Sequence, residues 1–267
     1  MMQLAPLRLP VFKIIAGSVM LFWERRHALL QVLWLPLLLG VAFTISEGLW
    51  GPSSWEAGSV ELDARLQTSL LLWTLPLFAL TVVFAVRSYR VYLLGDQQPV
   101  KFAPISWGLR ETRFIFAMAG IAFIFATAAF LFGSIVALLW PGVGEFAGGR
   151  FGLALILPPA YLAARLLLAF PALATDKSED VFQALAASWK MTRRNGWRVL
   201  ALCVVVPGAV AWSLEQVGQL PIPGINLVSA IAVWAAMPVE LALVALSYVT
   251  LQRSNSAATA DSTESAE

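Results

Sequence analysis

The 267-residue sequence has little charge for its length. Asp, Glu, Lys and Arg make up 13% of the residues, whereas hydrophobic residues make up 59%, and the mean hydropathy is +0.77. Soluble globular domains carry about 25% charged residues. Because so few charged groups cannot cover the surface of a water-soluble fold, the composition excludes that class and places the chain in a membrane.

The side chains that carry most enzyme chemistry are also scarce. Cys203 is the single cysteine and His27 the single histidine. Neither has the partners that a disulfide, a metal site or a catalytic dyad requires. The motifs HExxH, GxSxG, the P-loop and GxGxxG followed by an acidic residue are all missing from the sequence. We therefore expect no enzymatic activity, no metal and no cofactor.

Long apolar stretches are what the chain does have. Each can cross a hydrocarbon core of about 30 Å at about 1.5 Å per residue. They predict an all-α polytopic membrane domain over residues 1–253, a bundle of six transmembrane helices at 28–49, 68–86, 114–140, 152–173, 199–217 and 226–250. A basic 27-residue segment precedes the first span, so no cleavable signal peptide is expected. The tail, 254–267, is rich in Ser, Ala and Thr and is expected to be disordered.

Basic residues fall unevenly between the two ends of these spans. Fifteen of the 18 Lys and Arg residues lie in the N-terminal segment, the second and fourth connections and the C-terminus, whereas the opposite side holds only Arg65 and Arg150. Basic residues mark the cytoplasmic side of a membrane protein. Both termini are therefore expected to face the cytoplasm.

Related segments recur along the chain. Residues 11–18 and 181–188 share the pattern Val-Phe-x-x-x-Ala-x-Ser at an offset of 170, and a Ser-Trp pair at 106–107 marks a segment between them. Hydrophobic-Pro pairs recur at 75–76, 157–158 and 237–238, in the even-numbered spans. The pattern predicts a threefold internal repeat of one interfacial helix followed by two spans. The alternative is chance recurrence in apolar sequence.

Two of these segments have apolar residues at helical spacing beside basic ones. They predict amphipathic helices in the cytoplasmic interface over 9–24 and 179–195. The segment before the third span has only a shorter amphipathic stretch.

Two charged residues are expected deep in the bilayer. Arg165 in span four and Glu240 in span six lie at similar distances, about 16 to 20 Å at 1.5 Å per residue, from the inner ends of their spans. An unpaired charge at that depth costs at least about 2.5 kcal/mol. One interpretation is a structural Arg165–Glu240 ion pair, and the other is that Arg165 receives an anionic headgroup or solute while Glu240 is its counter-ion.

The basic inner loops predict contacts with anionic lipid headgroups, because these attract Lys and Arg at the inner leaflet. The loops are short and flank spans, so we expect no nucleic acid; protein partners are unknown. The expected headgroup contacts are Arg87, Arg90, Arg110, Arg113, Arg193, Arg194 and Arg198.

Residues 182–198 read F-x-A-L-x-x-S-W-x-M-T-R-x-N-G-W-R and lead into an apolar span. This segment resembles that of bacterial six-span membrane proteins of the YciC type and of the membrane domain attached to some glycerophosphodiester phosphodiesterases. The resemblance covers about ninety C-terminal residues. It implies a six-helix domain of the bacterial inner membrane, and no phosphodiesterase activity, because the chain has no soluble catalytic domain.

The functional hypothesis is a non-enzymatic, multi-pass inner-membrane protein with a lipid-associated or scaffolding role. One alternative is a small transporter or channel whose path lies near Arg165 and Glu240. The other is a subunit of a larger membrane complex.

Overall fold

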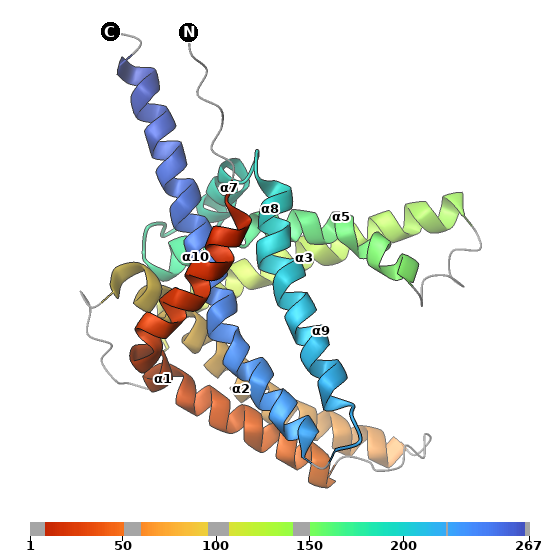
Figure 1. Cartoon of the computed structure of the whole chain (residues 1–267). Helices are drawn as coiled ribbons and strands as arrows, with labels where there is room; N and C mark the ends of the chain where they lie inside the picture. Colours follow the sequence, from red (N-terminus) through yellow and green to blue (C-terminus); the bar gives the residue numbers. More distant parts are fainter. Residues whose placement is uncertain (1–8, 51–59, 96–106, 141–149, 223, 265–267) are drawn as a thin grey trace.

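The structure is a computed structural model of the chain. It describes the backbone of residues 9–50, 60–95, 107–140, 150–222 and 224–264. Side chains are described for 9–42, 75–95, 107–140, 155–222, 224–225 and 227–256. Figure 1 shows the whole chain.

The described part of the chain folds into helices. In chain order they are α1 (Val11–Trp50), α2 (Val60–Leu94), α3 (Leu109–Leu139), α5 (Arg150–Leu166), α6 (Ala169–Ala174), α7 (Val181–Met191), α8 (Gly196–Leu200), the π-helical turn η2 (Ala201–Val205), α9 (Val206–Gly218) and α10 (Ile225–Glu264). The π-helical turn directly precedes Pro207, whose ring and missing N–H disturb regular α-helical bonding.

Five of the predicted membrane spans are present as helices of sufficient length and hydropathy. They are Leu75–Leu94, Leu109–Leu139, Leu155–Ala174, Gly196–Gly218 and Leu227–Ser256. The protein is therefore an all-helical protein with the character of a multi-pass membrane protein. The first predicted span, 28–49, falls within α1, but its side chains from 43 onward lie outside the described residues. This first span therefore stays a prediction.

The largest of three clusters of buried apolar side chains in the described residues joins most of the helices, and we call it the hub. It draws residues from α1, α2, α3, α5, α6, α7, α8, η2 and α10. At its centre the ring of Phe114 on α3 stacks on Phe170 of α6, 4.4 Å between centroids, and lies 6.2 Å from Tyr89 of α2. The hub is thus the place where segments far apart in the sequence are held together.

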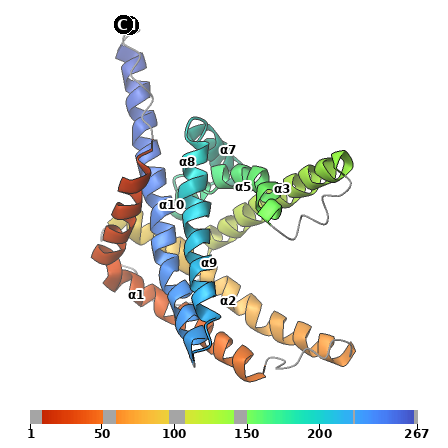
Figure 2. The same cartoon turned by 45° about the vertical axis from the view of Figure 1, so that its right-hand side comes forward.

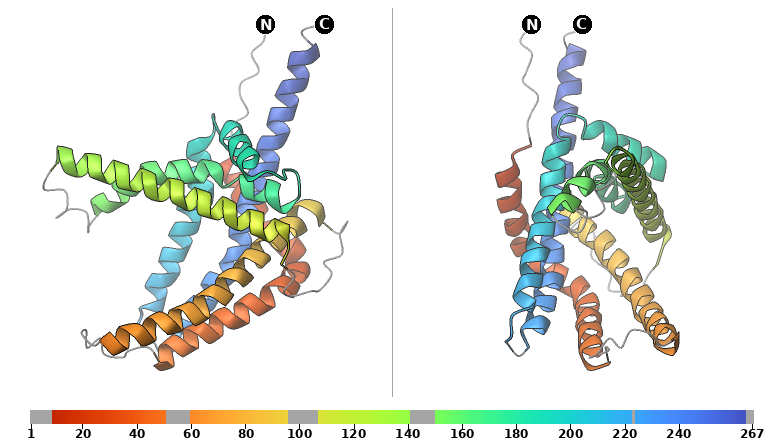
Figure 3. Two further views of the ribbon diagram at one scale, coloured as in Figure 1. Left: turned by 180° about the vertical axis from the view of Figure 1, so that it is seen from behind. Right: turned by 90° about the vertical axis from the view of Figure 1, so that its right-hand side faces the viewer.

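The helices leave the hub in two directions. Helix α10 packs against α1, α2 and α9, and these four run toward one end of the molecule, whereas α3 and α5 form a hairpin that points elsewhere (Figures 1 and 3). The expectation of one bundle of six helices is therefore not met in this structure. Side chains of Phe123, Phe130 and Leu138 on the outer turns of α3 are exposed. Lipid tails solvate such side chains as well as another helix does, so little drives the hairpin onto its neighbours.

The predicted interfacial helix 9–24 is not a separate element. It continues into the first predicted span as one helix, α1, which changes direction part-way along its length (Figure 2). The residues that join the two parts, Glu24-Arg25-Arg26-His27, include neither Gly nor Pro. Extending an existing helix by one residue costs no new nucleation, so the helix propagates through them.

The second predicted interfacial helix, 179–195, is observed as the shorter α7 and shares a burial pattern with the start of α1. Ile14 and Ser18 are buried on α1, as Ala184 and Ser188 are on α7, at the offset of 170 residues. Phe12 is exposed on α1, as Phe182 is on α7. The two segments therefore turn equivalent faces toward the hub. The central segment that the repeat requires includes 96–106, which lies outside the described residues.

The C-terminal segment expected to be disordered is instead largely helical. Helix α10 runs to Glu264 and passes the hub, so that its end projects from the body (Figure 1). Three alanines lie between residues 257 and 260, and alanine is the strongest helix former. Because α10 is already nucleated, this segment continues it at low cost.

Gly40 of α1 lies directly against Trp234 of α10. A Cβ built on Gly40 would overlap the indole ring of Trp234. Gly133 on α3 has no neighbouring atom within 4 Å of the same position. Only a hydrogen side chain therefore allows α1 and α10 to pack at Gly40.

We predict that Gly40→Val destabilises the protein by about 1–3 kcal/mol, because the added atoms must displace Trp234. The measurement is thermal unfolding of the detergent-solubilised protein. Gly133→Ala is the control and should leave the transition unchanged or raise it slightly, since Ala favours a helix. Equal stability of the Gly40→Val variant and the wild type would contradict the packing of α1 on α10.

Candidate functional site

Arg165 is a buried charged residue beside the hub, with 7% of its surface exposed. It lies at the end of α5 and reaches the end of α7. Its Nη2 donates a hydrogen bond to the Trp189 carbonyl at 2.7 Å, and its Nε donates to Thr192 Oγ1 at 3.2 Å. The guanidinium also lies over the Trp189 ring, 3.5 Å from the centroid. These contacts bind the charge without a carboxylate.

The main chain at Arg165 is bound from the same side. The Ser188 hydroxyl donates to the Arg165 carbonyl at 2.6 Å. The Thr192 hydroxyl donates to the Ser188 carbonyl at 2.9 Å, and both hydroxyl side chains are buried. Side chain and backbone of Arg165 together fix the end of α5 to the end of α7, and we call this set of contacts the Arg165 clamp.

The predicted Arg165–Glu240 pair is not formed in this structure. Arg165 contacts α7, and no ion pair joins it to Glu240, which lies half-buried on α10. The expected depth of Arg165 assumed one straight span. Instead α5 ends at Leu166 and a turn leads into α6, so that counting residues along a helix misplaces the guanidinium.

We predict that Arg165→Lys lowers the unfolding free energy by about 1–3 kcal/mol, because an ammonium cannot keep both hydrogen bonds and the ring stacking. Glu240→Gln should leave stability nearly unchanged. Thermal unfolding of both single variants and the double variant measures the coupling between the two sites. Additive effects are expected, and a coupling above about 1 kcal/mol would restore the ion-pair interpretation.

The turn after α7 also holds the residue that precedes α1. The Leu9 N–H donates to Asn195 Oδ1 at 3.2 Å, and the Leu9 carbonyl accepts from Arg198 Nη1 at 2.9 Å. Leu9 is buried, so both of its backbone groups need protein partners. Arg198, an expected headgroup contact, therefore serves to hold the N-terminal end of α1.

Gly196 completes this turn. A Cβ built on Gly196 would overlap the Tyr161 side chain, whose ring lies 4.6 Å from that of Trp197 between centroids. The polar and small residues of the 182–198 motif thus have structural contacts. Those with assigned partners are Ser188, Trp189, Thr192, Asn195, Gly196 and Arg198.

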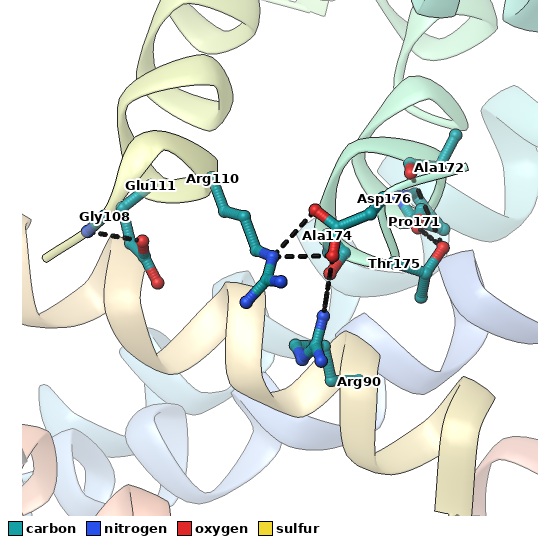
Figure 4. Close-up of polar contacts among 9 residues, drawn as sticks. All are labelled: Arg90, Gly108, Arg110, Glu111, Pro171, Ala172, Ala174, Thr175 and Asp176. Carbon is teal, nitrogen blue, oxygen red and sulfur yellow. Dashed lines mark hydrogen bonds and ion pairs between the residues drawn. The ribbon is translucent and has the colours of Figure 1, made fainter. Parts of the chain in front are cut away.

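Two further expected headgroup contacts, Arg90 and Arg110, converge on Asp176 instead. Arg110 Nε lies 2.7 Å from both carboxylate oxygens, and Arg90 Nη1 lies 3.3 Å from Oδ2 (Figure 4). Arg90 Nη1 also donates to the Ala174 carbonyl at the end of α6, at 3.1 Å. Asp176 therefore links α2, α3 and α6, and it adopts a positive φ of 56° where the chain leaves α6.

The charged form of Asp176 is favoured by this arrangement. Partial burial alone would raise the pKa of Asp176, but the hydrogen bonds and charges of Arg110 and Arg90 outweigh it and lower the pKa below its ordinary value. Because the pKa is lowered on folding, the ionised group stabilises the fold above the unfolded pKa of about 3.9. The stabilisation is lost as the pH falls through the lower folded-state pKa.

We predict that Asp176→Asn lowers the melting temperature at neutral pH, because two arginines lose their shared carboxylate. Asn tolerates the positive φ, so the backbone should be kept. The difference from wild type should be constant above about pH 5 and shrink below about pH 4. Glu179→Gln, which neutralises an exposed carboxylate in the same loop, is the control and should change the melting temperature little. If the melting temperatures of Asp176→Asn and wild type differed by the same amount at every pH, the assigned role of Asp176 would be contradicted.

The other expected headgroup arginines on α2 and α3 lie beside the hub. Arg87 is within electrostatic reach of Glu111, whose buried carboxylate accepts the Gly108 N–H at 2.9 Å at the start of α3. Arg113 lies two residues further along α3 and is partly exposed. Neither lines the groove described next.

A groove of about 810 Å³ lies between α7 with its following turn and the C-terminal part of α10. Four basic side chains line it, Lys177, Lys190, Arg193 and Arg194, and no Asp or Glu is among the lining residues whose side chains the structure describes. Lys177 donates to Gln252 Oε1 at 3.0 Å and lies 5.4 Å from the centroid of the Tyr248 ring, across the groove. A hollow this basic attracts anions.

Two of these cations, Arg193 and Arg194, are available to a ligand. Both are exposed, and in the described part of the chain neither guanidinium has a hydrogen bond or ion pair. They also line a second hollow of about 350 Å³ on the other side of the turn, beside Tyr161 and Trp197. Of the seven arginines expected to contact headgroups, these two face open space suitable for an anion.

The sequence interpretation overlooked three residues of this region. Asp176, Lys177 and Lys190 were not expected to belong to a site. For the first, the signal was an acidic residue directly after span four, at the start of a connection with five basic residues. Lys190, on the polar side of an amphipathic helix and close to Arg193 and Arg194, was a signal for the groove.

Comparison of the chain with protein-family models, with curated proteins and with solved structures found no match. The resemblance of residues 182–198 to YciC-type proteins therefore stays a prediction.

Proposed function

We propose that the protein is a non-enzymatic, multi-pass membrane protein that binds anionic lipid headgroups at its cytoplasmic face and has a lipid-associated scaffolding role. The observation that carries the proposal is the groove between α7 and α10, whose described lining side chains include four basic and no acidic ones. An anionic phosphate gains charge-assisted hydrogen bonds from such side chains.

The position of the groove supports a lipid rather than a fully soluble ligand. It lies at the end of the span that finishes with α6 and beside α7, whose Phe182 side chain is exposed. Exposed aromatic side chains on such a helix suit the headgroup region of a bilayer. We assign this end to the cytoplasm of a bacterial cell, with both termini inside, because the basic residues gather there.

The equivalent burial of the start of α1 and of α7 supports the internal repeat. Both helices place a small or aliphatic residue and a serine against the hub and leave a phenylalanine outside. We therefore infer that the two segments are equivalent members of repeated units, each beginning with an amphipathic helix beside the hub. Only the third member carries the basic turn with Arg193 and Arg194.

The alternatives make different demands on the same residues. A transport path near Arg165 and Glu240 would need a guanidinium free to receive a solute, and that of Arg165 is held by Trp189 and Thr192. A subunit of a larger complex would retain a protein partner on gentle extraction. Native mass spectrometry of the gently extracted protein would report such a partner directly as added mass.

We predict that Arg193→Gln/Arg194→Gln weakens the binding of anionic phospholipid by roughly 10- to 30-fold, at about 1 kcal/mol for each lost cation. Native mass spectrometry of the full chain in mild detergent, titrated with phosphatidylglycerol, gives the bound fraction. The matched control, Lys13→Gln/Arg253→Gln, removes the same charge from exposed residues that do not line the groove. Equal weakening in both variants would indicate non-specific attraction and contradict a groove site.

A further inference from the structure

The groove has two chemically different walls. Lys190, Arg193 and Arg194, from α7 and the turn after it, form the basic wall. The opposite wall on α10 contributes polar, uncharged side chains, Gln252, Ser254, Asn255 and Ser256, and Lys177 is hydrogen-bonded to Gln252 there. A phosphate is suited to the first wall, and the second wall must face whatever group the phosphate carries.

The hydroxyl groups on the neutral wall are arranged as hydrogen-bond acceptors. Ser254 Oγ donates to the Leu251 carbonyl at 2.9 Å, and Ser256 Oγ donates to the Gln252 carbonyl at 3.0 Å. At the edge of the groove Ser178 Oγ donates to the Asp180 carbonyl at 2.9 Å. Because each hydroxyl proton is already used, the oxygen lone pairs are what these serines offer to a ligand.

Two kinds of headgroup can donate to such acceptors, an ammonium and a hydroxyl. An ammonium would lie in a hollow that already holds four cationic side chains, and none of the described lining side chains is a carboxylate that could neutralise it. Like charges at such short separation repel, whereas a neutral hydroxyl does not. The groove thus favours hydroxyl donors over ammonium donors.

We infer that the groove selects a polyol phosphate, with the phosphate on Arg193, Arg194 and Lys190 and the polyol hydroxyls on the serines of α10. The inference rests on the proposed anionic-headgroup function and adds the class of headgroup. A phospholipid with a glycerol headgroup and a free polyol phosphate both fit this description, since each presents a phosphate and hydroxyl groups.

The test compares ligands of equal formal charge on the full chain in detergent. Phosphatidylglycerol and phosphatidylserine with identical acyl chains both carry a net charge of about −1, but the second has an ammonium and a carboxylate in place of the glycerol hydroxyls. Native mass spectrometry should give phosphatidylglycerol about fivefold or more tighter binding. Soluble glycerol 3-phosphate is added as a competitor, and effective competition at concentrations similar to the lipid would identify the soluble source of this chemistry.

The variant Ser254→Ala/Ser256→Ala tests the neutral wall, and it should fold because Ala favours a helix more than Ser does. It is expected to reduce phosphatidylglycerol binding about threefold or more while leaving phosphatidylserine binding unchanged. Equal affinity for the two lipids in the wild type would overturn the polyol assignment and leave the proposed function standing. Failure of both lipids to bind would instead overturn the proposed function.

Discussion

Burial of one arginine without an acidic partner constrains the rest of this structure. Arg165 needs hydrogen-bond acceptors in the low-dielectric hub, and it takes them from Trp189 and Thr192. An uncompensated charge in such surroundings is costly, so α5 and α7 must keep their relative position. The turn after α7 is fixed as a consequence, and Asn195 in that turn binds the backbone of Leu9 before α1. One set of contacts therefore connects the chain's first helix to its fourth span.

The fixed turn also explains why its two remaining arginines face a groove. With Arg198 holding Leu9, and Arg90 and Arg110 held by Asp176, the structure uses most of its inner arginines for itself. Arg193 and Arg194, which have no partner in the described part of the chain, lie beside the polar end of α10. The described side chains on the outer turns of α3, in the diverging α3–α5 hairpin, include Phe123, Phe130 and Leu138, which are apolar and suited to lipid. Residues with structural contacts and residues with the proposed binding role are thus neighbours in one motif.

Much of the architecture follows from the pattern of apolar and polar residues within each segment. Five spans and the position of α7 were predicted because hydropathy and helical spacing report what a segment requires from its surroundings. Contacts between distant segments were not predicted. The predicted ion pair between Arg165 and Glu240 was wrong because span four was taken as one straight helix. Arg90 and Arg110 were assigned to lipid because their actual partner, Asp176, lies at least 66 residues away in the sequence. A residue's type shows what it can bind, whereas the fold decides which partner is near.

Photo-crosslinking locates the bound headgroup most directly. The protein is reconstituted with a phosphatidylglycerol that carries a diazirine at the start of one acyl chain, close to the phosphate, and crosslinked peptides are identified by mass spectrometry. The account predicts adducts on 177–194 and 248–256, the segments that border the groove. Adducts confined to the apolar outer turns of α3, with none on those two segments, would show that the lipid contacts the protein only as solvent and would contradict a headgroup site.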